Sequence, residues 1–369
     1  MLVYIIRRWD DKNPNNQITN RFDIKDYELV IDYTSNSTSK FKIQAEHEIR
    51  SEIKASDFIY VPDFKWIGLI KEYDKTSHEI VAGDILNAYQ FPYYVDPITK
   101  FADIAGWIVN QLEQSKIKFP ELKMDMFNWT NTTTTRAVVT MDYDNGGIEK
   151  FRDIAQDLLL RGRITDTTRD LGFRIYVDNI DNTSTAYKGL QINMAIGVTS
   201  QPSTTKFVYS EDKGRRRVVE NLEIKDKQLT QTSVILYNED GTEKGQYWLD
   251  QNYGSVIPNR PSTSMYPIYV GGYVIKETTS TDEVPPTDLQ IAASQLPVNQ
   301  ANNFTFTISK TQGFIGLKDI LPGTVISVSI VKGTDVERVL KGAISTLSVN
   351  ESEYKVTVGQ DRPKLVLTI

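Results

Sequence analysis

The sequence predicts a β-rich α+β protein, in which an inserted α/β unit and a second, smaller insertion interrupt two β-units. Three observations predict this class. Apolar residues alternate along many short runs bounded by polar turns, helical spacing is concentrated between residues 96 and 162, and a loop-rich stretch precedes the last strands. With 369 residues the chain is long enough for about two to three domains of roughly 150 residues each.

Residues 1–95 are expected to form the first β-unit. The apolar run from Met1 to Ile6 precedes Arg7 and Arg8, whereas a signal peptide places its charge first, so this run is expected to be a strand. The clearest strand spans residues 40–50. Its inward positions alternate with charged and polar ones and are Phe41, Ile43, Ala45, His47 and Ile49.

Residues 96–187 are expected to form the inserted α/β domain. Asp96 and Pro97 are suited to cap a first helix, and a second helix should follow Asn145-Gly146-Gly147 and end near Gly162. The apolar positions of these helices are Ile98, Phe101, Ala105, Ile108 and Leu112, and then Ile148, Phe151, Ile154, Ala155, Leu158 and Leu159. Strands near residues 137–141 and 172–177 flank the second helix.

Strands resume in residues 188–241 and 304–369, which together are expected to form the second β-unit. Asn238-Glu239-Asp240-Gly241 has the composition of a tight hairpin turn. Residues 242–303 are rich in Pro, Ser and Tyr and contain one helical stretch at 287–296, so they are expected to form an inserted loop and helix domain.

An internal echo links the two β-units. The first copy has Gly68-Leu69-Ile70, a polar turn and then Gly83-Asp84. The second copy has Gly342-Ala343-Ile344, a polar turn and then Gly359-Gln360-Asp361. The paired glycines are 15 residues apart in the first copy and 17 in the second, so an alignment needs a gap, and chance similarity of two hairpins is the alternative.

Composition excludes several classes of function. Forty-two Lys and Arg against 48 Asp and Glu give a net charge of −6, which argues against a general nucleic-acid binder. The absence of Cys excludes disulfides, thiolate nucleophiles and Cys-ligated metals. No apolar window approaches the roughly 18 residues of a membrane helix, so synthesis in the cytoplasm without an export signal is expected.

Few residues offer chemistry. His47 and His78 lack the second His of a zinc-binding helix, and a phosphate-binding glycine motif is absent. Residues 142–147 partly match a calcium loop, but Gly146 replaces a ligand and the segment is better explained as a turn. We therefore predict no enzyme activity, catalytic residue, metal site or cofactor. A carboxylate pair of the glycosidase type would leave no local signature, so a carbohydrate-active enzyme is the third-ranked alternative.

The strongest charge cluster is Lys213-Gly214-Arg215-Arg216-Arg217. Guanidinium groups bind carboxylates and phosphates through paired hydrogen bonds. Because the chain as a whole is acidic, Arg215, Arg216 and Arg217 are expected to contact another subunit or a protein partner rather than DNA, and a solvated loop is the alternative.

The order of these units resembles the central hub proteins of tailed-phage baseplates and tail tips. Relatives include the hub of contractile tails and the N-terminal structural part of the Tal proteins of siphophages. The segments that carry the resemblance are Asp96-Pro97-Ile98, residues 233–241 and Leu321-Pro322-Gly323-Thr324-Val325-Ile326.

This resemblance implies two related antiparallel β-barrels per chain and a homotrimer that presents six barrels in a ring. Such a trimer would close the tail tube at the virion tail tip, contact the distal tail protein ring, the tape-measure protein and receptor-binding proteins, and open for DNA as passing cargo. Longer relatives add a C-terminal hydrolase or fibre region, so a short structural hub and a piece of a longer protein are both compatible with the sequence.

The main alternative is a receptor- or saccharide-binding module. Tyr247, Trp248 and Tyr253 lie in the second insertion, and exposed aromatic rings commonly stack on sugars. A hub must form a closed ring, whereas such a module can act as a monomer.

Overall fold

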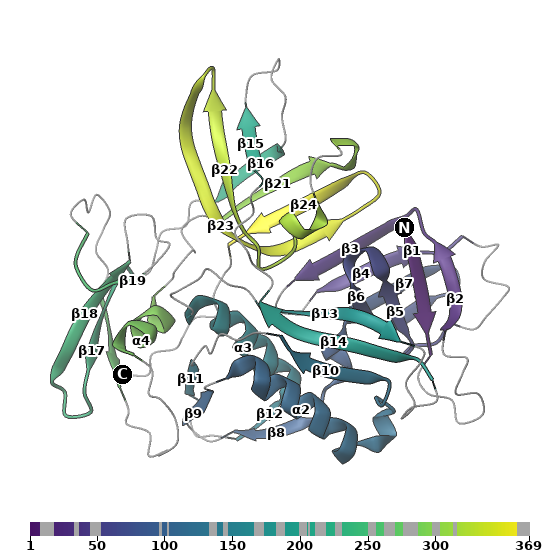
Figure 1. Ribbon diagram of the computed structural model, residues 1–369, viewed down its shortest axis with the longest axis horizontal. Helices are drawn as coiled ribbons and strands as arrows, with labels where there is room; N and C mark the ends of the chain where they lie inside the picture. The colour runs from purple at the N-terminus through teal and green to yellow at the C-terminus, as the bar shows by residue number, and fades with distance from the viewer. Residues whose placement is uncertain are drawn as a thin grey trace.

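The computed structural model describes residues 1–7, 18–32, 37–44, 53–95, 98–101, 103–132, 139–142, 147–165, 173–181, 189–198, 205, 207–210, 219–225, 231–249, 256–261, 270–275, 287–296, 303–312 and 316–359. The predicted β-rich class is confirmed, because strands dominate these residues and most neighbouring strands pair antiparallel (Figure 1). The predicted strand at 364–369 and the second half of the strand at 40–50 lie outside the described residues.

The first β-unit begins with the predicted N-terminal strand. Its elements are β1 (Leu2–Ile6), β2 (Ile18–Asp23), β3 (Tyr27–Asp32), β4 (Thr38–Lys42), β5 (Phe58–Val61), β6 (Trp66–Asp74) and β7 (Glu79–Asp84), with 3-10 turns η1 (Pro62–Phe64) and η2 (Ile85–Ala88). Burial alternates along β4 as the sequence predicted, with Phe41 and Ile43 buried and Lys40 and Lys42 exposed. One face of this strand therefore contributes to the core.

The second β-unit contains six described strands. They are β15 (Phe207–Ser210), β16 (Glu220–Lys225), β21 (Asn303–Ser309), β22 (Val325–Lys332), β23 (Asp335–Val349) and β24 (Glu353–Val358), with 3-10 turns η4 (Lys310–Gln312) and η5 (Leu317–Asp319). Each lies where the alternation of apolar residues predicted a strand.

The two β-units follow the same path of strands. The first runs β3-β4-β7-β6-β5-β1 and the second runs β16-β21-β24-β23-β22-β15. When β2, which pairs with β1 and has no counterpart among the described strands, is left out, each strand has the same rank along the chain as its counterpart, so β1 corresponds to β15, β3 to β16, β6 to β23 and β7 to β24. One ladder differs, because β1 is antiparallel to β5 whereas β15 is parallel to β22.

The hairpins behind the sequence echo are equivalent in detail. A bulge interrupts the β6–β7 ladder after Ile70, two residues beyond Gly68, and another interrupts the β23–β24 ladder after Ile344, two residues beyond Gly342. In the next ladder of each unit, Phe41 of β4 pairs with Ile80 and Phe306 of β21 pairs with Val356. Because Ile80 and Val356 are equivalent positions of β7 and β24, Phe41 corresponds to Phe306. The two additional residues of the second copy lie at the hairpin end, beyond the equivalent pairs Asp74–Glu79 and Ser348–Lys355.

In each unit a backbone hydrogen bond lies near the two ends of the path, and only its donors occupy equivalent positions, because β1 and β15 run in opposite directions relative to their neighbours. Ile24 N donates to Met1 O at 2.8 Å in the first unit, and Val219 N donates to Val208 O at 3.2 Å in the second. Ile24 lies four residues before Glu28, and Val219 lies four residues before Glu223, the residue that corresponds to Glu28 in the second unit. Among the described strands neither path closes into a full ladder.

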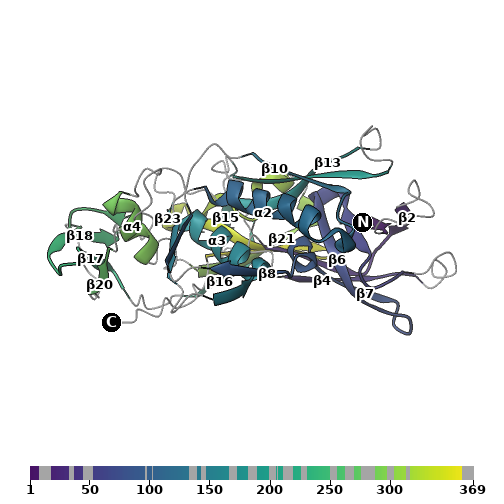
Figure 2. The ribbon, with the colours of Figure 1, turned by 90° about the horizontal axis from the view of Figure 1, so that it is seen from below.

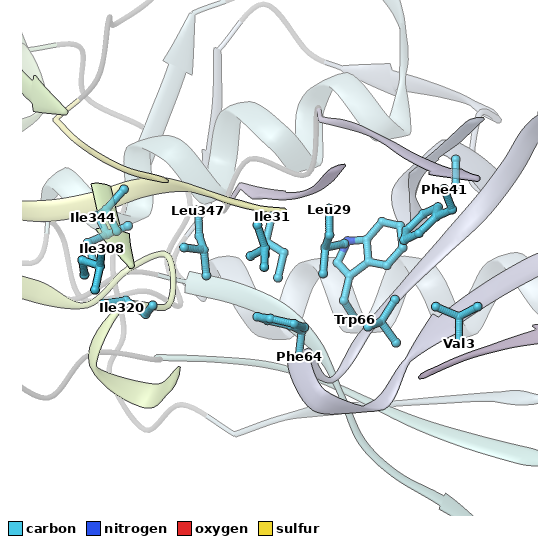
Figure 3. Close-up of a cluster of buried hydrophobic side chains, with 14 of the residues drawn as sticks. Val3, Leu29, Ile31, Phe41, Phe64, Trp66, Ile308, Ile320, Ile344 and Leu347 are labelled. Carbon is cyan, nitrogen blue, oxygen red and sulfur yellow. The ribbon is translucent and has the colours of Figure 1, made fainter. Parts of the chain in front are cut away.

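The two units are joined into one sheet. Thirteen of the described strands belong to it, because β3 pairs antiparallel with β23 from Leu29–Val349 to Asp32–Thr346. A single apolar core runs across the junction, and Figure 3 shows Ile31 beside Leu347, with Trp66 and Phe41 on one side and Ile308 and Ile344 on the other. The core of each unit thus continues into that of the other.

The inserted α/β unit packs two helices against a three-stranded sheet (Figure 2). Its elements are β8 (Pro92–Val95), β9 (Ile98–Phe101), α2 (Ile104–Lys118), η3 (Pro120–Leu122), β10 (Phe127–Asn131), β11 (Val139–Asp142), β12 (Gly147–Lys150), α3 (Phe151–Thr165), β13 (Phe173–Asp181) and β14 (Gln191–Val198). The sheet has the order β10-β14-β13, so β14, which the sequence grouped with the second β-unit, pairs here instead. Val177 N donates to Lys65 O at 2.9 Å and ties this unit to the first β-unit.

The predicted start of the first helix is wrong. The helix begins at Ile104, where the Asp103 carboxylate accepts a hydrogen bond from Gly106 N at 3.0 Å. Ile98–Phe101 is instead strand β9, paired with β11, and Asp96 and Pro97 lie outside the described residues. Asp103 stands immediately before the first helical residue, so its carboxylate satisfies a helical N–H that has no partner within the helix. The predicted inward residues Ala105, Ile108 and Leu112 are buried.

Both predicted limits of the second helix also differ. Gly147–Lys150 forms β12, paired with β8, so Ile148 is 74% exposed rather than part of the helical apolar face. Helix α3 then runs from Phe151 to Thr165 and passes through Gly162. Glycine costs only about 1 kcal/mol in a helix interior, which packing of the buried face offsets. The buried residues of that face are Phe151, Ile154, Ala155, Leu158 and Leu159, as predicted.

A small unit separates β16 from β21. It contains β17 (Ser233–Tyr237), β18 (Glu243–Leu249), β19 (Val256–Ile257), β20 (Val270–Val274) and α4 (Asp288–Gln295). Its sheet has the order β19-β18-β17-β20, so β17, which the sequence grouped with the second β-unit, pairs here. The predicted hairpin turn is confirmed, with Asn238 N donating to Thr242 O at 2.9 Å and Gly241 at φ +80. Helix α4 lies within the predicted 287–296 segment.

Substitution of either equivalent phenylalanine tests whether the two β-units unfold together. Phe41→Ala and Phe306→Ala each remove a fully buried ring from the shared core and are expected to lower the free energy of unfolding by about 3–5 kcal/mol. Denaturant unfolding followed by tryptophan fluorescence should show one transition in both variants. Lys355→Ala on the exposed side of β24 is the control and should change little. Two separated transitions would contradict a common core.

Candidate assembly surface

Most of the residues that the sequence singled out for chemistry or contacts lie outside the described ranges. Arg215, Arg216 and Arg217 lie outside the described residues, as does His47. His78 occupies the turn between β6 and β7 at φ +58, and its carbonyl accepts a hydrogen bond from Ile43 N at 2.9 Å. His78 therefore has a turn position, consistent with a structural role.

The calcium-like segment joins β11 to β12. Asp142 ends β11 and Gly147 begins β12, and residues 143–146 lie outside the described ranges. In the part of the chain that the structure describes, His, Cys, Asp and Glu side chains form no group of three or more suited to a metal ion. No helix in the same ranges is long and apolar enough to cross a membrane.

The aromatic residues of the second insertion are engaged within the small unit. Tyr247 packs against the core formed by α4 and the sheet, and the Arg260 guanidinium lies 5.5 Å from the ring centroid of Trp248. Tyr253 lies outside the described residues. Arg260 thus covers part of the ring surface that a sugar would need.

The most extensive contact between the two β-units is the β3–β23 junction. Leu29 and Ile31 of β3 and Leu347 and Val349 of β23 are at most 3% exposed. Burial of each such aliphatic side chain contributes about 1.5–3 kcal/mol. At the outer side, Ser348 Oγ donates to Glu28 Oε1 at 3.4 Å. Apolar burial therefore dominates this junction.

Lys310, the first residue of η4, binds residues on both sides of the β3–β23 junction. Its Nζ donates to the Tyr27 hydroxyl at 2.7 Å and to the Asn350 carbonyl, and it lies 5.1 Å from the Tyr27 ring centroid. The ring of Tyr354 lies 5.2 Å away. One ammonium group thus links β3 of the first unit to the β23–β24 hairpin of the second.

The Lys310 contact shifts the titration of its members. Burial raises the pKa of Tyr27 to about 12, with the charges of Tyr354 and Glu351 adding to the effect. Burial lowers the pKa of the Lys310 ammonium from its ordinary value, although Glu351 and Asp63 act in the opposite direction. Lys310 and Tyr27 were missed by sequence reasoning, because 283 residues separate them and no motif marks either one.

A buried cation lies at the edge of the α/β unit. Arg174 on β13 is 6% exposed, and its Nε and Nη1 find no hydrogen-bond partner within the described part of the chain. Its guanidinium lies 5.0 Å from the ring centroid of Tyr176, and burial lowers its pKa to about 10. The Tyr176 ring supplies the electrostatic contact that partly offsets the loss of water.

The hairpin of β22 and β23 forms an arm that projects from the sheet (Figure 1). Val336 and Val339 near its tip are 58% and 56% exposed. Exposed apolar side chains on a projecting strand offer a contact surface for another protein.

Comparison with known proteins gives a consistent picture of the fold. No protein-family model and no curated protein sequence matches the chain. The crystal structure of prophage tail protein gp18 from Listeria monocytogenes EGD-e is similar with a TM-score of 0.55 and 13% identity, over 99% of this chain and 96% of that chain. The tail protein from Neisseria meningitidis MC58 is similar with a TM-score of 0.50 and 11% identity, over 98% and 96%.

The chain has the fold of these phage tail proteins. The likeness covers the inserted α/β unit and the small unit as well as the two β-units, because almost the whole chain is matched. The resemblance derived from the sequence is thus confirmed at the level of the fold.

Replacing Lys310 should weaken the junction without changing the fold. Lys310→Met keeps the length of the side chain and removes two hydrogen bonds, and a cost of about 1–2 kcal/mol is expected because the site is partly exposed. Denaturant unfolding measures this loss, and Lys355→Ala serves as the control. An unchanged free energy of unfolding would show that the ammonium contact does not stabilise the junction.

Alkaline pH should weaken the same junction. Tyr27 has an ordinary pKa of 10.0 that is raised to about 12 in the fold, so its contribution to stability is complete below pH 10 and is lost as the pH rises to 12. Unfolding midpoints measured from pH 9 to pH 12 should therefore fall less steeply for Tyr27→Phe than for the unaltered protein. Equal slopes would contradict the shifted pKa.

Proposed function

We propose that the protein is a structural subunit of a phage tail, and that it forms the homotrimeric hub of the tail tip or baseplate. The observation that carries this proposal is the repetition of one six-strand path within a single chain. The whole-chain likeness to two tail proteins supports the tail location. The proposed role is to assemble and to enclose a passage, and it requires no catalysis.

The two β-units are proposed to act as two related barrels. Their equivalent bulges and equivalent buried phenylalanines support this, as do the backbone hydrogen bonds with equivalent donors near the ends of each path. The bond from Ile24 N to Met1 O, and the one from Val219 N to Val208 O, join the ends of the two paths. Each unit can thus enclose its own share of the apolar core.

Two similar units per chain provide a means of matching symmetries. A closed ring needs repeated complementary contacts, and a ring of three chains contains six similar units. Such a trimer can sit on a sixfold tail ring without six copies of the chain. The distal tail protein ring is the proposed partner on that side, and the tape-measure protein and receptor-binding proteins are the proposed partners elsewhere.

The charge of the chain suits a conduit. A net charge of −6 gives no general attraction for phosphates, so DNA can pass as cargo without being retained. In this proposal the trimer closes the tail tube before infection and opens afterwards, and the projecting β22–β23 arm provides a contact for neighbouring tail proteins.

Absolute mass decides the assembly. Three chains of 42.0 kDa give a trimer of about 126 kDa, which light scattering at several protein concentrations should detect. Negative-stain images should show a central opening and six lobes, and the particle should bind a distal tail ring. A monomer that persists at high concentration and in the presence of that ring would overturn the proposal.

A further inference from the structure

The β3–β23 junction has an equivalent pair of strands that do not pair with each other within one chain. Strand β3 pairs with β23, and their equivalents in the other β-unit are β16 and β6. Strand β16 belongs to the second unit and β6 to the first, and they are not paired with each other in the described ranges. The chain therefore uses one of two equivalent contacts.

Strand β16 has the same surroundings as β3, apart from the missing neighbour. On one side, β16 pairs with β21 and β3 pairs with β4. On the other side, a residue that precedes each strand donates a backbone hydrogen bond, from Val219 N to Val208 O before β16 and from Ile24 N to Met1 O before β3. Beyond that bond, β3 pairs with β23 through Leu29–Asp32. At the equivalent place, Ile224 and Lys225 pair with β21 alone among the described strands, and Lys225 is exposed.

Strand β6 offers the matching edge. Its Glu72–Asp74 segment pairs with β7 on one side, and the ladder with β5 on the other side ends at Leu69. Glu72 and Asp74 are exposed. Their equivalents in β23 are Thr346 and Ser348, which lie opposite Asp32 and Val30 of β3.

Transferring the internal register to the open edges places opposite charges together. Val30 corresponds to Lys225, because Glu28 corresponds to Glu223 through the ladders with Lys40 and Thr305. Ser348 corresponds to Asp74. The neutral Val30–Ser348 pair of the internal junction is thus replaced by Lys225 opposite Asp74, a cross-strand pair of opposite charge.

We propose that β16 of one copy pairs antiparallel with β6 of the next copy, so that the contact between subunits repeats the β3–β23 junction within each chain. This inference rests on the proposed trimer and names the surfaces that join it. The contact is heterologous, since two different edges meet, and repeated copies of such a contact close a ring of three when each copy is rotated by a third of a turn. Charged residues on both edges also discourage unrelated strands from adding there.

Disulfide trapping tests the register directly. The chain contains no cysteine, so a pair introduced by Asp74→Cys and Lys225→Cys provides the only two thiols. Mild oxidation of this variant should produce covalent dimers and trimers on non-reducing gels. The matched control pair, Val30→Cys with Ser348→Cys, should cross-link within the monomer, because these positions already face each other in one chain.

Each outcome bears on a stated claim. Light scattering on the unaltered protein reports the trimer, independently of the cross-link. In one outcome the unaltered protein is a trimer and the internal control pair oxidises fully, but the variant with Asp74→Cys and Lys225→Cys forms no cross-link. This result overturns the β16–β6 contact and leaves the proposed hub intact. A protein that is monomeric and does not cross-link overturns both. Dimers formed equally by either single-cysteine variant would also contradict the contact, because they indicate pairing between like edges.

Charge reversal provides a second readout that does not depend on oxidation. Lys225→Asp or Asp74→Lys alone should weaken trimer association by about tenfold, and the double reversal should restore most of it. Glu121→Lys on the exposed η3 turn is the matched control and should leave the trimer unchanged. Single reversals without any effect on association would contradict the proposed register.

Discussion

The pairing of β3 with β23 is the constraint on which the rest of the molecule depends. It places Leu29, Ile31, Leu347 and Val349 in one continuous apolar core, so neither β-unit is complete without the other. Lys310 adds a polar fastening at the edge of the same contact through Tyr27 and Asn350. Because the core is shared, the separation of the two units would expose apolar surface in both and would be opposed by the hydrophobic effect.

The inserted units leave this framework intact. The α/β unit shares a second core with the first β-unit, in which Ile108, Leu112, Phe151 and Leu158 of the helices are fully buried. It is held to the first β-unit by the Val177–Lys65 backbone bond and by apolar contacts that include Phe58, whose ring lies 5.1 Å from that of Phe127. The framework can thus present additional surfaces without any change in the path of its strands.

Sequence reasoning succeeded where a local pattern determines structure. Alternation of apolar residues located most strands, and the glycine echo located two equivalent hairpins before their ladders were known. It failed at helix starts, because Ile98–Phe101 carries apolar residues that suit a strand as well as a helix, and only pairing with β11 decides between them. The β3–β23 junction could not be predicted from local patterns, because Lys310 and Tyr27 meet through strand pairing between segments distant in the chain. The pairing of β17 within the small unit was missed for the same reason.

The location of the small unit has a consequence for how such chains can vary. Residues 33–37 connect β3 to β4, whereas residues 226–302 connect the equivalent strands β16 and β21 and include the whole small unit. The entropy cost of closing a connection grows only slowly with its length, so the same framework accepts a brief turn or an independent module at this point. Because the module has a separate core of Val234, Leu236, Ala292 and Leu296, its sequence can change without disturbing the shared sheet. Chains of this architecture can therefore acquire new surface chemistry by exchanging one connection.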